Sequence, residues 1–189
     1  MPLTKLDEVC ALVVIDLQKG VAGMAVAHPM NGIIDRSAQL ARAFREHQLP
    51  VVLVNVSGSA PGHTDIPRPN YSFPPDWTEL VPELDEQASD HLVTKQCWGA
   101  FLGTGLDDYL RLRDVTQIVL TGVATSIGVE STARNAYDLG YNVTLVTDAM
   151  TDRDADAHHY SVEKIFPRLG ETALTDEVMK LLKTSMHED

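Results

Sequence analysis

Short apolar runs rich in β-branched residues recur along the chain and alternate with stretches of helical spacing. The runs 11–15 and 51–56 have the composition of strands that are buried on both faces of a sheet. Further strand candidates are residues 91–94, 117–121, 142–147 and 171–175, the last as a short edge strand. Helical spacing occurs over residues 33–47, 106–112, 131–139 and 176–183.

Strands that alternate with helices predict right-handed βαβ crossovers and therefore a parallel sheet. We expect an α/β fold, a three-layer sandwich with a mostly parallel sheet of about six strands and helices on both faces. The chain of 189 residues is most simply a single domain over residues 1–189 with a substantial core. The proline-rich stretch 57–80 lacks a clear period, and so long a loop in a compact domain is usually functional or an arm.

Acidic residues exceed basic ones, with 27 Asp and Glu against 15 Lys and Arg and a net charge of −12. This balance argues against nucleic acid or an anionic membrane as partner, because both require a basic surface. It permits a small anionic substrate, since one local cation can dominate a pocket. The apolar run Cys10–Ile15 is too short for a membrane span and follows acidic residues, so we expect neither a signal peptide nor a transmembrane segment. Two cysteines do not make a disulfide framework, and we expect a soluble, cytoplasmic protein.

Two charged residues stand directly after predicted strands. Asp16 follows the first strand, and the carboxyl end of a strand is where open α/β sheets bind ligands. Partial desolvation there raises the pKa of a carboxyl and suits it to acid or base catalysis. A capping or salt-bridged aspartate fits this position equally well. Lys95 follows the third strand, and a surface lysine is the ordinary interpretation, although Val93, Trp98 and Phe101 make its surroundings apolar.

Three segments together resemble the isochorismatase-like hydrolase superfamily, which also contains nicotinamidases and other cysteine-dependent amidases. They are residues 16–18, 94–101 and 117–134, in the order and at the distances of that family, and the resemblance covers nearly the whole chain. The resemblance implies that Asp16 and Lys95 are catalytic. Lys95 would then set the protonation of Asp16 and bind a substrate carboxylate.

Gly128 stands where the amidase branch of this family carries its catalytic cysteine. The true isochorismatases also lack that cysteine, so the resemblance implies acid-catalysed chemistry, with Gly128 as the third catalytic position. It further implies a cis peptide between Val123 and Ala124 in a turn that holds a substrate oxygen. From the residues alone, this segment is a plain strand-to-helix turn with glycine chosen for close packing. Ala124 and Ser126 replace the tyrosine and histidine of the true isochorismatases, which places the chain between the two branches.

The same turn allows a rival interpretation as a serine esterase. Ser126 lies in the outline of a degenerate nucleophile elbow, and Asp148 with His158 or His159 follows in the chain order of an α/β-hydrolase triad. Ala124 stands in place of the first glycine of an elbow, and the chain is short for that fold. The resemblance to the isochorismatase-like hydrolases also accounts for the charged strand-end residues, which the esterase interpretation does not.

Six residues are candidates for substrate binding, namely Gln18, Arg68, Trp98, Phe101, Val123 and Ala124. Gln18 lies close after the candidate catalytic aspartate. Arg68, in the proline-rich loop, can meet a carboxylate bidentately, although a solvated loop arginine is the ordinary interpretation. Trp98 and Phe101 are more often core residues, and the family motif favours a place in the site.

No clustered metal-ligand spacing appears near His63 and Asp65, so we expect no metal and no other cofactor. Cys97 is interpreted as a small buried residue rather than a displaced nucleophile. We therefore expect a homo-oligomeric hydrolase, a dimer or larger, that acts by acid catalysis on a small carboxylated vinyl ether such as isochorismate. The alternatives are an amidase or serine-type esterase, and an inactive binding or oligomeric family member. Retention of Asp16 and Lys95 argues against the inactive alternative.

Overall fold

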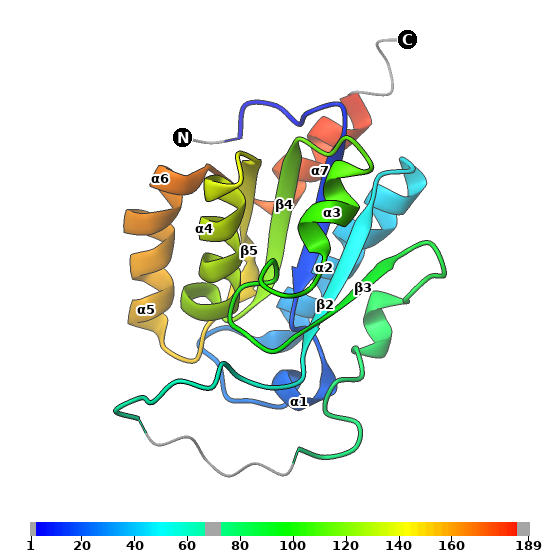
Figure 1. Cartoon of the computed structure of the whole chain (residues 1–189). Coiled ribbons are helices and arrows are strands. Elements are labelled where there is room, and N and C mark those ends of the chain that lie inside the picture. The colour runs from blue at the N-terminus through cyan, green and yellow to red at the C-terminus, as the bar shows by residue number, and fades with distance from the viewer. Residues whose placement is uncertain (1–2, 67–72, 185–189) are drawn as a thin grey trace.

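The computed structural model describes residues 3–66 and 73–184, which build a six-stranded sheet between two layers of helices (Figure 1). The strands are β1 (Cys10–Ile15), β2 (Val51–Val56), β3 (His91–Lys95), β4 (Gln117–Val123), β5 (Asn142–Thr151) and β6 (Glu171–Ala173). Their order across the sheet is β3-β2-β1-β4-β5-β6, and each neighbouring pair is parallel. The predicted α/β sandwich with a mostly parallel sheet is confirmed.

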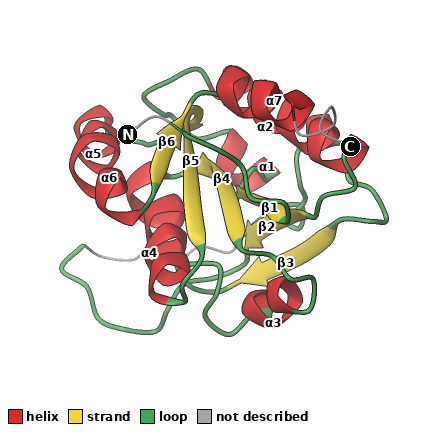
Figure 2. Ribbon diagram, turned by 90° about the horizontal axis from the view of Figure 1, so that it is seen from above, coloured by secondary structure: helices red, strands yellow, loops and turns green. Residues whose placement is uncertain are grey.

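Helices cover both faces of this sheet (Figure 2). On one face lie α2 (Met30–Glu46) and α7 (Thr175–Thr184). On the other lie α3 (Leu106–Arg111), α4 (Glu130–Asp138), α5 (Ala155–Tyr160) and α6 (Phe166–Leu169). Strand side chains alternate between the layers: Leu12 packs with the α2 side, and Val13 packs with the α3 and α4 side. This alternation explains why whole strands are buried and read as continuous apolar runs.

The two largest departures from the predicted elements lie in the second half of the chain. β5 continues to Thr151 instead of ending at residue 147, because a register shift between Leu120 and Gly122 restores its pairing with β4. Residues 155–169 form α5 and α6 around a π-helical turn, Ser161–Ile165, which the sequence pattern did not predict. A short helix, α1 (Lys19–Ala22), a 3₁₀ turn, Pro82–Leu84, and a second π-helical turn, Thr125–Val129, complete the described elements.

The strand order reverses direction between β1 and β4, which lie side by side at the centre of the sheet. From β1 the chain proceeds to β2 and β3 on one side, and from β4 it proceeds to β5 and β6 on the other. Such a switch point opens a crevice at the carboxyl ends of the strands, where α/β proteins bind their ligands. Asp16, Lys95 and the turn after β4 all lie at this end.

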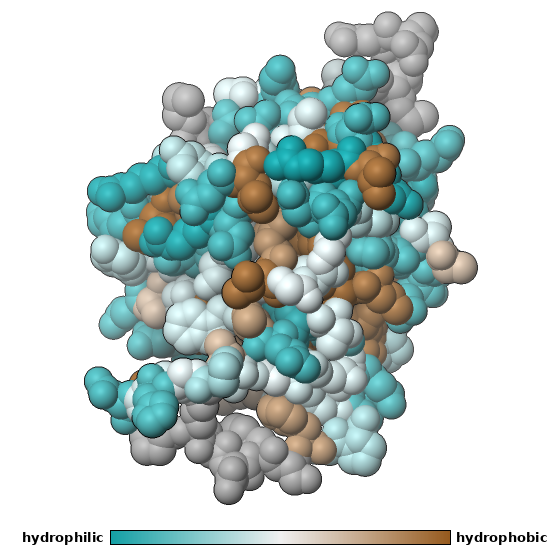
Figure 3. All heavy atoms as spheres, in the orientation of Figure 1, coloured by the Kyte–Doolittle hydropathy of each residue, from teal (hydrophilic) through white to brown (hydrophobic). Residues whose placement is uncertain are grey.

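Hydrophobic side chains form small separate patches among hydrophilic ones on the face shown in Figure 3. In residues 3–66 and 73–184, no helix is long and apolar enough to cross a membrane.

Candidate active site

Asp16 and Lys95 form a buried ion pair at the carboxyl ends of β1 and β3. Lys95 Nζ lies 2.8 Å from Asp16 Oδ2, and the exposed fractions of the two residues are 2% for the lysine and 6% for the aspartate. Lys95 also donates to the backbone carbonyl of Cys97 at 3.2 Å. The second carboxyl oxygen, Asp16 Oδ1, is buried and accepts no hydrogen bond from the described residues. One oxygen of Asp16 is therefore held by the lysine, and the other has no hydrogen-bond partner among the described residues.

Burial raises the pKa of the Asp16 carboxyl to about 6, and the neighbouring ammonium of Lys95 opposes this shift. Burial has the larger effect because removing a carboxylate from water costs more than the lysine returns. The pKa matters for chemistry, since a carboxyl that titrates near 6 still carries a proton in part of the molecules at neutral pH. An ordinary exposed aspartate is almost fully ionised there.

Position 128 lies directly beside this pair. A Cβ atom added to Gly128 would stand 3.3 Å from Asp16 Oδ2 and 3.0 Å from Ile15 Cγ2. A side chain at 128 would thus start within contact distance of the Asp16 carboxyl, which is the relation that a nucleophile and its base require.

Gly122 explains how the turn after β4 comes so close to β1. Its φ is +113°, and a Cβ there would lie 2.0 Å from the carbonyl oxygen of Ile15. Only glycine permits this backbone contact. The next peptide, between Val123 and Ala124, is cis, as the family resemblance implies, and the chain then enters the π-helical turn Thr125–Val129.

A cavity of about 230 Å³ opens over the ion pair. It is lined by Asp16, Val21, Met24, Val26, Val56, Gly58, Ser59, Lys95, Cys97, Trp98, Val123, Ala124, Ile127, Gly128 and Arg153. The structure thus brings together six of the predicted site residues: Asp16, Lys95, Trp98, Val123, Ala124 and Gly128. The remaining walls are largely apolar.

Three other predicted substrate-binding residues are not part of this lining. Gln18 is fully buried, and its side-chain amide joins the backbone of Val56 to the carbonyl of Trp77 at 2.7–3.1 Å, so it positions the chain rather than contacting a ligand. Phe101 packs against the core on the α3 side, with its ring 5.9 Å from that of Tyr141. Arg68 lies outside the described residues.

Arg153 lines the cavity and was missed by the sequence analysis. The signal that identified Asp16 and Lys95 was a charged residue just after a strand. Arg153 has the same relation to β5, two residues after Thr151. The pattern ended that strand at residue 147, so the arginine did not stand out.

The residues of the esterase interpretation do not assemble into a triad. Ser126 Oγ donates to Asp152 at 2.8 Å, whereas Asp148 accepts hydrogen bonds from Thr175. Elsewhere, His158 Nδ1 lies 2.8 Å from the hydroxyl of Thr125, and His159 pairs with Glu163 on the surface. None of these hydrogen bonds joins Ser126 to a histidine.

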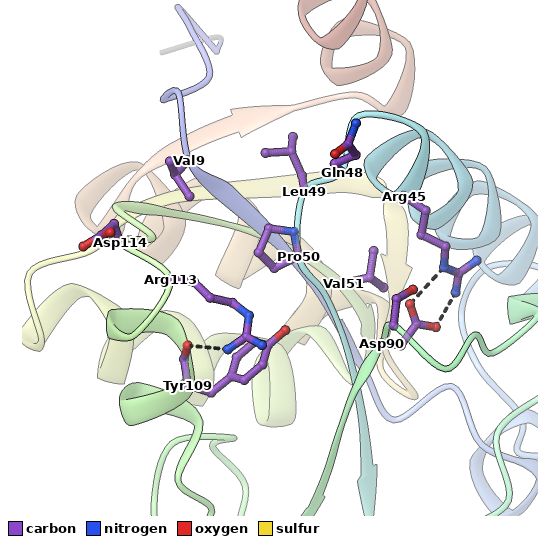
Figure 4. A pocket seen from close by; sticks show the side chains of 11 residues that line it. Val9, Arg45, Gln48, Leu49, Pro50, Val51, Asp90, Tyr109, Arg113 and Asp114 are labelled. Carbon is purple, nitrogen blue, oxygen red and sulfur yellow. Dashed lines mark hydrogen bonds and ion pairs between the residues drawn. The ribbon is translucent and has the colours of Figure 1, made fainter.

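A larger cavity of about 590 Å³ lies at the opposite, amino-terminal end of β1 and β2 (Figure 4). Arg45 donates to both oxygens of Asp90 there, and the Arg113 guanidinium lies 3.9 Å from the ring centre of Tyr109. The Asp90 side chain is also buried and ion-paired, but both of its carboxyl oxygens accept hydrogen bonds, whereas Asp16 keeps one oxygen without a partner among the described residues. The smaller cavity also holds six of the predicted site residues, so we place the candidate site there. In the part of the chain that the structure describes, no group of three or more His, Cys, Asp and Glu side chains is arranged to hold a metal ion.

The isochorismatase domain model matches residues 10–177 of the chain. The isochorismatase family protein YwoC of Bacillus subtilis, whose activity is uncharacterized, is 41% identical over 92% of this chain and 94% of its own length. A solved isochorismatase family protein from Burkholderia thailandensis has a TM-score of 0.91 at 41% identity, covering 95% of this chain and 98% of that one. N-carbamoylsarcosine amidase from Thermoplasma acidophilum has a TM-score of 0.74 at 27% identity, covering 89% and 97%. The chain therefore belongs to the isochorismatase family of hydrolases.

Proposed function

We propose that this hydrolase cleaves a small carboxylated vinyl ether such as isochorismate by acid catalysis, without a metal ion and without the cysteine of the amidase branch. The observation that carries the proposal is the surroundings of Asp16. Its carboxyl has a raised pKa and one unpartnered oxygen, and it faces a glycine at the position where a nucleophile would act.

The cavity supports the metal-free part of this proposal through its donor set. Asp16 is the one carboxylate in the described lining, the lining contains no histidine, and Lys95 already holds one oxygen of that carboxylate. A divalent cation would have to displace the lysine and would find a single anionic ligand, whereas zinc sites use three or four protein ligands.

In the proposed reaction, protonated Asp16 donates its proton to the terminal carbon of the enol ether. The double bond becomes an oxocarbenium ion, and the new carboxylate of Asp16 is stabilised by Lys95. A water molecule then adds to the cationic carbon and returns a proton to Asp16. In the resulting hemiketal, the bond between the former cationic carbon and the ether oxygen breaks. The proton of the new hydroxyl passes to the ring oxygen, which releases pyruvate and the ring alcohol. One water is consumed, and the enzyme regains its starting protonation state.

Amide hydrolysis by a displaced thiol is a second candidate, because Cys97 lines the same cavity and its carbonyl accepts a hydrogen bond from Lys95. The structural similarity to an amidase gives this candidate further weight. In that reaction Asp16 would be a base, and Cys97 would carry the acyl group.

Activity on isochorismate and on a panel of small amides separates the two candidates. Pyruvate release is measured for the wild type, Asp16→Asn and Cys97→Ala, with Asp35→Asn as the matched control because Asp35 is an exposed carboxyl on α2. We expect Asp16→Asn to lower the rate by about 10²–10⁴-fold, the usual contribution of a general acid. Cys97→Ala and Asp35→Asn should retain the wild-type rate. Turnover of an amide that disappears in Cys97→Ala, with no pyruvate from isochorismate, would replace the vinyl-ether proposal with the amidase one.

A further inference from the structure

Arg153 gives the cavity a second cation, and it differs from Lys95 in being available. The ammonium of Lys95 is engaged by Asp16 and by the carbonyl of Cys97. Arg153 is exposed, lines the cavity and makes no ion pair with any described residue. A substrate anion that enters this space therefore meets a free guanidinium and a lysine whose charge is already compensated.

Hydrogen bonds of Asp152 and Asp154 fix the backbone on both sides of Arg153, so the position of its Cα is well defined. Asp152 is buried, and its carboxylate accepts hydrogen bonds from the backbone N–H and hydroxyl of Ser126, at 2.7 and 2.8 Å. Its carbonyl accepts from the N–H of Ala27 at 2.8 Å. Asp154 caps α5 by accepting from the N–H groups of residues 156 and 157.

The carboxylates on either side of Arg153 make other contacts, and neither forms an ion pair with the guanidinium. Both oxygens of Asp152 accept hydrogen bonds, one from Ser126 and the other from the N–H of Asp154. The Asp154 carboxylate accepts hydrogen bonds from two backbone N–H groups in the first turn of α5. Arg153 thus stands next to a residue that is bound to the turn after β4, and it is exposed, lines the cavity and forms no ion pair with either sequence neighbour.

We propose that Arg153 binds the carboxylate of the substrate, and that the substrate is a small carboxylic acid with a compact apolar body. A guanidinium matches a carboxylate in a bidentate manner, and its charge is lost at no accessible pH. The walls formed by Val21, Met24, Trp98 and Ile127 suit the apolar body. Pockets that bind drug-sized ligands measure about 300–1,000 Å³. A cavity of about 230 Å³ therefore fits a smaller molecule. This inference rests on the proposed function for the reacting end of the substrate, and it moves carboxylate recognition from Lys95 to Arg153.

Binding of benzoate and of benzamide, its neutral analogue of the same shape, tests the inference without turnover. Calorimetry at neutral pH should show that the wild type prefers benzoate by about tenfold to a hundredfold, as expected for a charge-assisted hydrogen-bonding pair. Arg153→Gln should remove this preference, and Arg153→Lys should restore part of it. The matched control is Arg42→Gln, an exposed arginine on α2 outside the cavity lining, which should keep the full preference.

Two outcomes overturn the inference: no benzoate binding by the wild type at millimolar concentration, or a preference that survives Arg153→Gln and disappears in Lys95→Met. Failure of the proposed function would look different. If the benzoate preference behaves as expected while no vinyl ether is hydrolysed, the carboxylate subsite stands and the reaction assignment fails. If isochorismate is hydrolysed and Arg153→Gln leaves kcat/KM unchanged, the reaction stands and the subsite fails.

Discussion

The pH dependence of turnover distinguishes an acid role for Asp16 from a base role. Only the protonated carboxyl can donate a proton to an enol ether, and burial raises its pKa to about 6. With that pKa, the protonated fraction is about one half at pH 6, about one tenth at pH 7 and about one hundredth at pH 8. We therefore expect kcat/KM to be level below pH 6 and to fall about tenfold for each pH unit above it.

The assay is pyruvate release from isochorismate between pH 5 and pH 9, with the uncatalysed rate subtracted. The carboxylates of the substrate remain ionised over this range, so the falling limb belongs to the enzyme. Removal of Lys95 provides a check on the assignment. Because the lysine lowers the pKa of Asp16, Lys95→Met should move the carboxyl titration to higher pH, as followed by the NMR signal of the Asp16 carboxyl carbon.

Two profiles would refute the reasoning. A rate that rises through pH 6 to a plateau would mean that the ionised form of Asp16 is the active one, as required of a base that activates a thiol or water. A level profile would remove this carboxyl from the proton transfer that limits the rate.

Four further predictions concern single residues. Lys95→Arg should leave activity as low as Lys95→Ala in the pyruvate assay, since the planar guanidinium does not fit the buried position beside Asp16; near-wild-type turnover would point to a purely electrostatic role. Ser126→Ala should change turnover little, and a fluorophosphonate probe should not label the wild type; stoichiometric labelling of Ser126 would revive the esterase interpretation. Gly122→Ala should lower the free energy of unfolding, measured by urea titration, by at least about 2 kcal/mol. The new Cβ would collide with the Ile15 carbonyl, and the positive φ is unfavourable for alanine. An unchanged urea midpoint would contradict this prediction. The raised pKa of Asp16 means that the folded state binds more protons than the unfolded state between about pH 4 and pH 6. Over that range, the free energy of unfolding of the wild type should fall by up to about 3 kcal/mol relative to that of Asp16→Asn. Parallel curves of unfolding free energy against pH for the two proteins would contradict this.

The sheet was predictable because its strands are buried on both faces and therefore carry an unmistakable apolar composition. The residues at which the strands end were less predictable from the sequence. Polar residues such as Thr147 and Asp148 made β5 look finished, whereas the register shift beside Gly122 lets it continue. That shift depends on a glycine in contact with a neighbouring strand, which is a tertiary contact and leaves no local pattern.

The pairing of Asp16 with Lys95 was predictable only when their strand-end positions were combined with the family resemblance, because a capping aspartate and a surface lysine fit those positions equally well or better. The roles of Gln18 and Phe101 were not, because a motif shows that a residue lies near the site and not which way its side chain points. Arg153 was missed for a related reason: its place in the cavity comes from the Asp152 contacts with Ser126 and Ala27, which join segments far apart in sequence. Such residues become visible only when the strands are assembled.

The buried amide of Gln18 fixes the two ends of a long loop beside the candidate active site. Gln18 lies two residues after Asp16, and its amide forms hydrogen bonds with the backbone of Val56 and with the carbonyl of Trp77. These bonds hold both ends of the stretch between Val56 and Trp77, whatever the length of that stretch. Within that stretch, Gly58 and Ser59 line the cavity and residues 60–66 are exposed. Because lengthening an exposed loop costs little free energy, this stretch can be exchanged or extended without disturbing the Asp16–Lys95 pair. Under the proposed reaction, a loop grafted between Val56 and Trp77 should therefore change the substrate while Asp16 remains the proton donor.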